Sequence, residues 1–202
     1  MNKIIAICGD SGSGKTTLSN MIHKKLENSV IFECDRYHTW ERGDFHWKYM
    51  SPLSPLGNDI DDMARDVESL RNNKTIYVRD YDHETGKFTD QQKIEPKDYI
   101  IVTGLHTMKL EADLKIFIDT EKSLRQLWKI ERDFKERGYE VNDIINKIKE
   151  REIDFQNYIL PQSLHADLLV TYYWDKEVKL KLTSVNQTEL TDTITGIIDE
   201  RL

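Results

Sequence analysis

The sequence has little of what marks secreted, membrane-bound or disulfide-stabilised proteins. Its 202 residues include only two cysteines, Cys8 and Cys34, which are too few for a disulfide framework. Both lie in apolar runs typical of strands, so we expect buried packing rather than a redox role. The longest apolar runs, such as Lys3–Cys8 and Tyr99–Val102, are far shorter than the roughly 20 residues needed to cross a bilayer. Without a visible export signal at the N-terminus, we expect a cytoplasmic protein that does not associate with membranes.

Basic residues are fewer than acidic ones, 29 Lys and Arg against 36 Asp and Glu. The formal net charge is −7 and the pI is near 5.4. This balance argues against broad nucleic-acid binding, which draws its affinity from neutralising phosphates, although it leaves room for a local basic pocket. His23, His83 and His165 show no metal-ligand spacing. No repeat, low-complexity tract or linker interrupts the chain, so residues 1–202 are expected to form one domain.

What the sequence does have is an alternation of strand and helix patterns. A loop or lid is expected at Trp40–Gly57, where aromatic residues follow no clean period, and His83–Lys87 reads as the turn of a small hairpin. The pattern predicts an α/β fold with a mostly parallel central sheet flanked by helices. The predicted strands are Lys3–Cys8, Val30–Cys34, Thr75–Tyr81, Tyr99–Val102, Leu114–Ile118, Asp167–Thr171 and an edge strand Val178–Leu182. The predicted helices are Lys15–Leu26, one capped by Asn58, Glu121–Glu136, Val141–Tyr158 and Thr191–Leu202.

A glycine-rich motif lies between the first predicted strand and the first predicted helix. Gly9-Asp10-Ser11-Gly12-Ser13-Gly14-Lys15-Thr16 fits G-x-x-x-x-G-K-[ST], in the strand-to-helix context that confirms it. The glycines let successive backbone N–H groups point at phosphate oxygens, and the helix adds its positive end. Lys15 would contact the β- and γ-phosphates and the Thr16 hydroxyl would bind Mg²⁺. The motif therefore predicts a nucleoside triphosphate site, here taken to include Thr17, but does not reveal what receives the phosphate.

Two polar clusters are candidates for the acceptor side. Asp35 ends the second predicted strand, at the edge where ligands of a parallel sheet collect, and could accept a hydroxyl proton. A strand-ending Asp is also commonly a cap or turn residue. The second cluster places Lys129, Arg132, Asp133 and Arg137 on one side of a helix, although helices with mixed charges are usually solvated faces. The residues alone leave both alternatives open.

At these positions the sequence resembles the phosphoribulokinase and uridine kinase family. The similarity extends to about Val170 and rests on the phosphate loop, on Asp35-Arg-Tyr-His38 with Arg42, and on Arg132-Asp133 with Arg137-Gly138. Some stretches are more similar to phosphoribulokinases, namely Leu53–Asp59, Tyr81–Gly86, Gly104–His106, Lys129–Asp133 and Asp154–Tyr158. The resemblance implies a P-loop kinase fold with a helical lid, and an ATP- and Mg²⁺-dependent transfer of the γ-phosphate to a hydroxyl of a small acceptor, a phosphorylated sugar.

The resemblance also implies roles for individual residues. Asp35 would be the general base and, with Thr16, a ligand of Mg²⁺. Lys15, Lys129 and Arg132 would stabilise the transferring phosphoryl group, and Asp133 would support the acceptor or the arginines. His38, His106, Arg42 and Arg137 would bind the acceptor. The lid and acceptor-binding segments would be residues 36–57 and 125–160, approximately. A homo-oligomer is compatible with the sequence, which implies no nucleic-acid or membrane partner.

Two alternatives remain. Uridine kinases share the Arg-Asp and Arg-Gly steps, but they typically carry a His and an Arg after the central hairpin, where this chain reads Glu84–Thr89. The cationic residues favour an anionic acceptor, because Arg matches phosphate oxygens bidentately. In addition, Thr103 stands where the family usually has a Glu that helps to hold Mg²⁺. A nucleotide-binding regulator or pseudokinase is therefore the third hypothesis.

Overall fold

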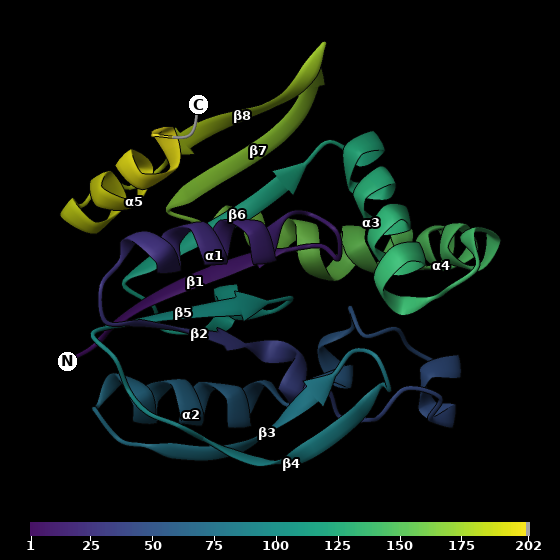
Figure 1. Cartoon of the computed structure of the whole chain (residues 1–202), viewed down its shortest axis with the longest axis horizontal. Coiled ribbons are helices and arrows are strands. Elements are labelled where there is room, and N and C mark those ends of the chain that lie inside the picture. Colours follow the sequence, from purple (N-terminus) through teal and green to yellow (C-terminus); the bar gives the residue numbers. More distant parts are fainter. Residues whose placement is uncertain (201–202) are drawn as a thin grey trace.

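A six-stranded sheet organises the fold (Figure 1). The computed structural model describes residues 1–200. Of the six strands, five are parallel, and the edge strand β8 is antiparallel to its neighbour. This confirms the expected α/β class with a mostly parallel central sheet. In spatial order the strands are β2 (Ser29–Glu33), β5 (Tyr99–Gly104), β1 (Lys3–Gly9), β6 (Leu114–Thr120), β7 (Leu168–Asp175) and β8 (Glu177–Ser184).

Helices cover both faces of this sheet. On one face, α1 (Lys15–Lys25) and α5 (Glu189–Asp199) pack on alternate residues of the strands, such as Ile5 and Ile7 of β1. On the other face, α2 (Ile60–Arg71) packs against Ile4 and its neighbours. Because both faces are buried, the central strands are apolar along nearly their whole length. The two cysteines are free and buried, as expected, although Cys34 lies in the 3-10 turn that follows β2 and only Cys8 lies in a strand.

The remaining elements gather at the carboxyl ends of the parallel strands. A separate hairpin is formed by β3 (Ile76–Asp82) and β4 (Lys87–Ile94). Figure 1 shows it beside α2, and it shows α3 (Lys122–Arg137) and α4 (Val141–Asp154) beyond the ends of the strands. Residues 40–57 contain only short 3-10 turns, in agreement with the predicted loop.

Three predicted boundaries need correction. Asp59, not Asn58, caps α2, since its carboxylate accepts from the Asp62 N–H, whereas the Asn58 side chain bonds the His38 ring. The helix predicted over Val141–Tyr158 ends at Asp154 and continues as a π-helical turn, Phe155–Ile159, which buries Phe155 and Ile159. The last helix ends at Asp199, and the predicted end at Leu202 lies outside the described residues.

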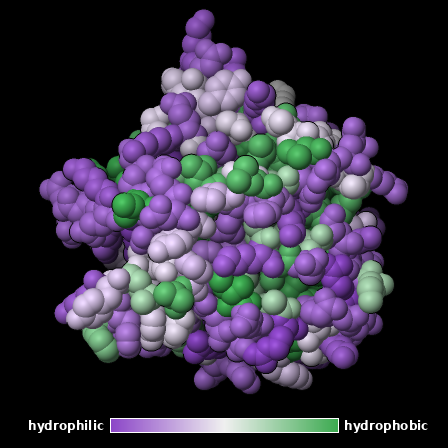
Figure 2. Space-filling model, turned by 180° about the vertical axis from the view of Figure 1, so that it is seen from behind, coloured by the Kyte–Doolittle hydropathy of each residue, from purple (hydrophilic) through white to green (hydrophobic). Residues whose placement is uncertain are grey.

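The molecular surface is mixed in character. Figure 2 shows the face opposite that of Figure 1, with apolar groups scattered among polar atoms and none dominating the view. Within residues 1–200, every helix is too short or too polar to traverse a lipid bilayer.

Two glycines give a stability test of this packing. A Cβ on Gly104 would lie 2.5 Å from Cβ of Cys34, whereas one on Gly196, inside α5, would meet nothing within 4 Å. Gly104→Ala should therefore lower the free energy of unfolding by about 1–3 kcal/mol through overpacking. Gly196→Ala should raise it by about 0.5–1 kcal/mol, because it removes backbone freedom from the unfolded chain. Urea unfolding measures both values, and a neutral Gly104→Ala would contradict the close contact between β5 and the turn after β2.

Candidate active site

The phosphate loop joins the carboxyl end of β1 to the first turn of α1. Gly12 and Gly14 adopt φ angles of 85° and 95°, in the left-handed region that favours glycine. Gly14 caps α1, so the backbone turns directly into the N-terminus of the helix. The Lys15 ammonium donates to the carbonyl oxygens of Gly9 and Asp10 at 2.9 and 2.7 Å. These contacts hold the Lys15 side chain back over the loop, where the β- and γ-phosphates of a bound nucleotide are expected.

Asp35 lies in the turn that follows β2. Because β5 separates β2 from β1 in a parallel arrangement, this turn and the phosphate loop meet at the same edge of the sheet. The Asp35 carboxylate lies 3.1 Å from Nε2 of His83 and 3.8 Å from Nε2 of His38. Burial raises the pKa of Asp35, but the hydrogen bond with His83 and the nearby His38 and Lys15 side chains outweigh it and hold the pKa well below its usual range.

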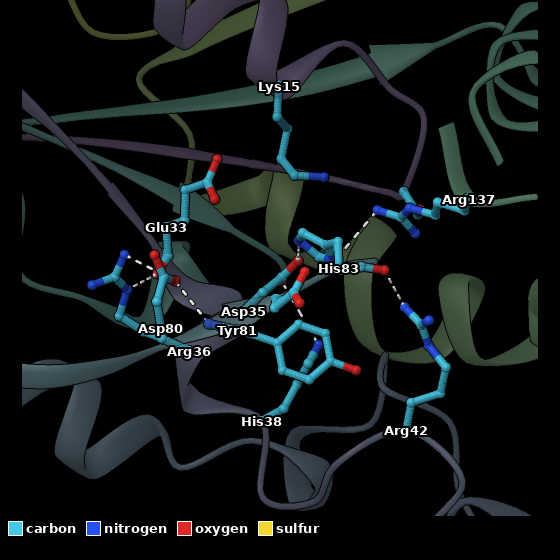
Figure 3. A network of polar contacts seen from close by, with 12 residues as sticks. Lys15, Glu33, Asp35, Arg36, His38, Arg42, Asp80, Tyr81, His83 and Arg137 are labelled. Carbon is cyan, nitrogen blue, oxygen red and sulfur yellow. Dashed lines mark hydrogen bonds and ion pairs between the residues drawn. The ribbon is translucent and has the colours of Figure 1, made fainter. Parts of the chain in front are cut away.

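His83 comes from the hairpin turn between β3 and β4, and its functional position was not anticipated. Its ring Nδ1 lies 3.3 Å from Nη2 of Arg137. A guanidinium can only donate, so Nδ1 accepts and Nε2 carries the proton that is donated to Asp35. The carbonyl oxygen of His83 also accepts from Arg42 at 2.6 Å. His83 thus connects the predicted base with both predicted acceptor-binding arginines (Figure 3).

The charged residues of α3 do not form a solvated face. Asp133 is 4% exposed and Lys129 is 8% exposed. The Asp133 carboxylate accepts from Lys129 Nζ at 3.0 Å and from Arg132 Nη2 at 2.7 Å, and lies 3.4 Å from Nη1 of Arg137. Burial raises the pKa of Asp133, but these cations overcome it and lower the pKa. Asp133 therefore neutralises part of a buried cationic cluster, which corresponds to the predicted support of the arginines and not of the acceptor.

Lys129 is the most perturbed cation of this cluster. Burial lowers its pKa to about 8, although the neighbouring Asp133 carboxylate acts in the opposite direction. Desolvation disfavours the charged ammonium, so Lys129 loses its proton close to the physiological range. Strong perturbation of this kind is common where charges serve a reaction.

The phosphate loop and α3 are in direct contact. The Ser11 hydroxyl accepts from Lys129 Nζ at 3.1 Å and from Arg132 Nη2 at 3.0 Å. A Cβ at Gly12 would lie 2.8 Å from Cβ of Lys129. Only glycine lets the loop approach the helix this closely. The cations of α3 are thereby placed over the loop that would hold the phosphates.

One cavity of about 970 Å³ joins these groups. Figure 3 shows the Lys15 and Arg137 side chains extending toward the region of Asp35 and His83. The segment around Trp47–Leu53 forms another wall, as expected for the aromatic loop. The predicted residues that line it are Lys15, Thr16, Asp35, His38, Arg42, Lys129, Arg132, Asp133 and Arg137, together with Ser11 of the loop.

His106 is the exception among the predicted acceptor ligands. It does not line this cavity, and its side chain is only 3% exposed. Its Nδ1 faces the Gln162 amide at 3.3 Å, between the sheet and the turn after α4. Burial lowers its pKa to about 4, so the ring is neutral at physiological pH. We therefore correct its assignment from acceptor binding to interior packing.

Other cavity residues were missed because no local pattern distinguishes them. Glu33, Tyr81, His83 and Arg151 all line the cavity. His83 and Tyr81 lie in the Tyr81–Gly86 stretch that supports the family resemblance, and that stretch was the available signal. Glu33 and Arg151 had no such signal, since each is an ordinary charged residue in a strand or helix.

Comparisons with known proteins bear on the family and the fold of the chain. A family model described as "Phosphoribulokinase / Uridine kinase family" matches residues 4–179. A phosphoribulokinase of Synechocystis sp. is 31% identical over 198 residues, covering 92% of this chain and 60% of that protein. A uridine kinase of Staphylococcus epidermidis is 33% identical over 178 residues, covering 83% of this chain and 86% of that protein. The chain thus spans only part of the length of the phosphoribulokinases it matches.

A solved structure shows the same fold. The phosphoribulokinase from Rhodobacter spheroides superposes with a TM-score of 0.71 at 22% identity, covering 98% of this chain and 85% of that one. At 22% identity this likeness shows the fold alone.

Proposed function

The chain belongs to the phosphoribulokinase and uridine kinase family, and from this membership we propose that it is a kinase. It transfers the γ-phosphate of ATP to a hydroxyl of a small, phosphorylated sugar. The observation that carries this proposal is the convergence of Asp35 with the cations of α3, Arg42 and Arg137 on the cavity in front of Lys15. A sugar phosphate needs a hydroxyl-facing base and cations for its own phosphate, and this cavity offers both.

Asp35 is proposed as the base that accepts the proton of the acceptor hydroxyl. Its pKa is held low by His83, His38 and Lys15, so it is ionised at neutral pH and free to accept. The 3.1 Å contact with His83 orients the carboxylate. A low pKa makes Asp35 a weak base before the reaction begins. The acceptor hydroxyl, however, becomes more acidic as it bonds to the phosphoryl group, so a carboxylate in the right position can accept its proton in the transition state.

The cations are proposed to divide between the two phosphates of the reaction. Lys15, Lys129 and Arg132 would offset the charge of the transferring phosphoryl group, because all three lie at the phosphate loop. Arg42 and Arg137, placed across the cavity, would bind the phosphate of the sugar. Residues near 36–57 and 125–160 would close as a lid and exclude water from this space.

The donors in the cavity fit Mg²⁺, which prefers oxygen ligands and uses only one or two carboxylates beside phosphates and water. The Thr16 hydroxyl and the Asp35 carboxylate line the cavity next to Lys15 and would hold the ion. Within residues 1–200, no group of three His, Cys, Asp or Glu side chains could hold a metal by itself, so the nucleotide phosphates would complete the site. When bound, Mg²⁺ supplies charge neutralisation for the β- and γ-phosphates.

A nucleoside acceptor is the alternative, favoured by the 33% identity to a uridine kinase. A pyrimidine needs an aromatic slot with base-edge donors. The cavity does contain Tyr81, Trp47 and Tyr139. Tyr81, however, packs edge-on against His38 and His83, so it holds these two rings in place and does not form a slot for a pyrimidine. The number of cations still favours an anionic acceptor.

A screen of acceptors tests the proposed function. We expect ATP-dependent ADP release with ribulose 5-phosphate or another sugar phosphate, and little with uridine or cytidine, because the cavity is cationic. A coupled ADP-release assay over both compound classes measures this. Activity confined to nucleosides would favour the alternative. Tight ATP binding without turnover on any acceptor would favour a nucleotide-binding regulator.

Asp35→Asn tests the base. Asn cannot accept the proton, so turnover should fall at least roughly a hundredfold while the affinity for ATP stays nearly unchanged. Steady-state kinetics and calorimetric titration with ATP give the two values. Asp61→Asn, which removes an exposed carboxylate of α2, is the matched control. Unchanged turnover in Asp35→Asn would remove Asp35 from the proposed reaction.

Lys129 makes the proposed activity sensitive to alkaline pH. Because the Lys129 pKa is lowered to about 8, the ammonium is charged below that pH and loses its proton above it. We expect kcat/KM, which reports the free enzyme, to fall as pH rises through about 8. Lys129→Arg keeps the charge and should move the decline to higher pH.

Lys135→Arg is the control for this profile, since Lys135 lies on the same helix in an exposed pair with Glu131. Its pH profile should match that of the parent protein. If kcat/KM of Lys129→Arg falls at the same pH as that of the parent protein, a group other than Lys129 causes the loss of activity at alkaline pH.

A further inference from the structure

We propose that Glu33 provides a carboxylate oxygen to the Mg²⁺ of the bound nucleotide, directly or through a water that the ion retains. It would thereby replace the carboxylate that the neighbouring strand lacks at Thr103. This inference rests on the proposed function, because it concerns the metal of the same nucleotide site.

The first support is the register between two adjacent strands. Glu33 is the last residue of β2, and its partner in the parallel β5 strand is Thr103. Paired residues in a parallel ladder point to the same face of the sheet. Accordingly, Glu33 and Thr103 both line the cavity that contains Lys15 and Thr16. A carboxylate on either residue would therefore face the same space.

The second support is the direction of the side chain. Figure 3 shows the Glu33 carboxylate extending along the cavity on the side of Lys15, away from the pair formed by Arg36 and Asp80. In the strand order, β2 lies one position farther from β1 than β5 does. The displacement is about 4.8 Å, the usual spacing between strands. The Glu33 side chain, alone or with one bridging water, is long enough to reach across this spacing toward the position that a carboxylate on Thr103 would occupy.

The third support is that Glu33 is partly buried and yet its carboxylate has no partner, unlike those of Asp35, Asp80 and Asp133 around it. Asp35 contacts His83, and Asp80 pairs with Arg36 at 3.2 Å. Asp133 contacts three cations. Among residues 1–200, no side chain forms a hydrogen bond or salt bridge with the carboxylate of Glu33, although the residue is only partly exposed.

An unpaired carboxylate in a phosphate site requires an explanation. Close to a triphosphate it would repel the ligand, unless a cation lies between the two negative groups. Partly buried carboxylates are normally paired or coordinate a metal. Mg²⁺ satisfies both requirements, because it prefers oxygen ligands and bridges carboxylates to phosphates. Among residues 1–200, the carboxylates of Glu84, Glu136 and Glu150 also line the cavity without a partner, but these three residues are exposed. Glu33 is the partly buried carboxylate of this cavity that could take that role without breaking an existing contact.

The test measures metal binding separately from turnover. Mn²⁺ serves as the paramagnetic probe for Mg²⁺. Electron paramagnetic resonance reports free Mn²⁺ while Mn²⁺ is added to the complex of the 202-residue chain with ADP. We expect Glu33→Gln to weaken Mn²⁺ binding by the protein–ADP complex by about tenfold or more. In metal-free buffer with a chelator, its affinity for ADP should stay the same or rise, because one negative charge near the phosphates is lost.

Two further variants make the test specific. Glu136→Gln removes another carboxylate that lines the cavity, from α3, and should bind Mn²⁺ as the parent protein does. Glu33→Gln combined with Thr103→Glu moves the carboxylate to the paired position on β5. Because residues 33 and 103 are paired and face the same cavity, this double variant should recover an affinity for Mn²⁺ within about threefold of that of the parent protein. Thermal unfolding of each variant verifies that it is folded.

The outcomes separate this inference from the proposed function. Mn²⁺ binding by folded Glu33→Gln within twofold of the parent would overturn the role of Glu33, while sugar-phosphate kinase activity of the parent would still stand. An equal loss in Glu136→Gln would also overturn it, since the effect would then be one of general charge. If the parent protein fails to bind ADP, the proposed function fails and this inference fails with it.

Discussion

The hydrogen bonds between the phosphate loop and α3 are the interaction on which the site depends. Ser11 accepts from Lys129 and Arg132, and Asp133 holds the same two cations from the other side. Gly12 makes the approach possible, because any side chain there would meet Lys129. Without this contact the cations of α3 would be solvated and separate from the nucleotide. With it they become part of the phosphate-binding surface, at the cost of desolvation that lowers the pKa of Lys129.

The order of the strands brings the acceptor side to the same place. Because β5 lies between β1 and β2, and all three are parallel, the loops that follow β1 and β2 open on one edge of the sheet. The hairpin then adds His83 to Asp35, and Arg137 and Arg42 contact His83 in turn. Four segments that are distant in the chain are therefore linked by short polar contacts around a single cavity.

The distribution of charge reconciles an acidic protein with an anionic ligand. The net charge of −7 describes the whole surface, whereas the cavity gathers Lys15, Lys129, Arg132 and Arg137. Within it, Asp35 contacts His83 and Asp133 contacts Lys129 and Arg132, whereas Glu33 is partly buried and its carboxylate has no partner among residues 1–200. A cluster of cations of this kind can attract anionic groups locally, whatever the sign of the overall charge.

The sequence by itself determined the fold class and the nucleotide site, because both depend on local patterns. The apolar runs of β1 and β5 reflect burial on both faces, and the eight residues from Gly9 to Thr16 encode a loop and a helix start within one short stretch. Only the tertiary structure decided which polar residues share the cavity. His83 and Glu33 have no periodicity or motif of their own, and their positions come from hairpin packing and strand register. For His106 the sequence was misleading: its position just after a strand suggested that it lines the site, but its ring packs into the interior. Long-range contacts of this kind are set by how elements pack, which no single stretch of chain contains.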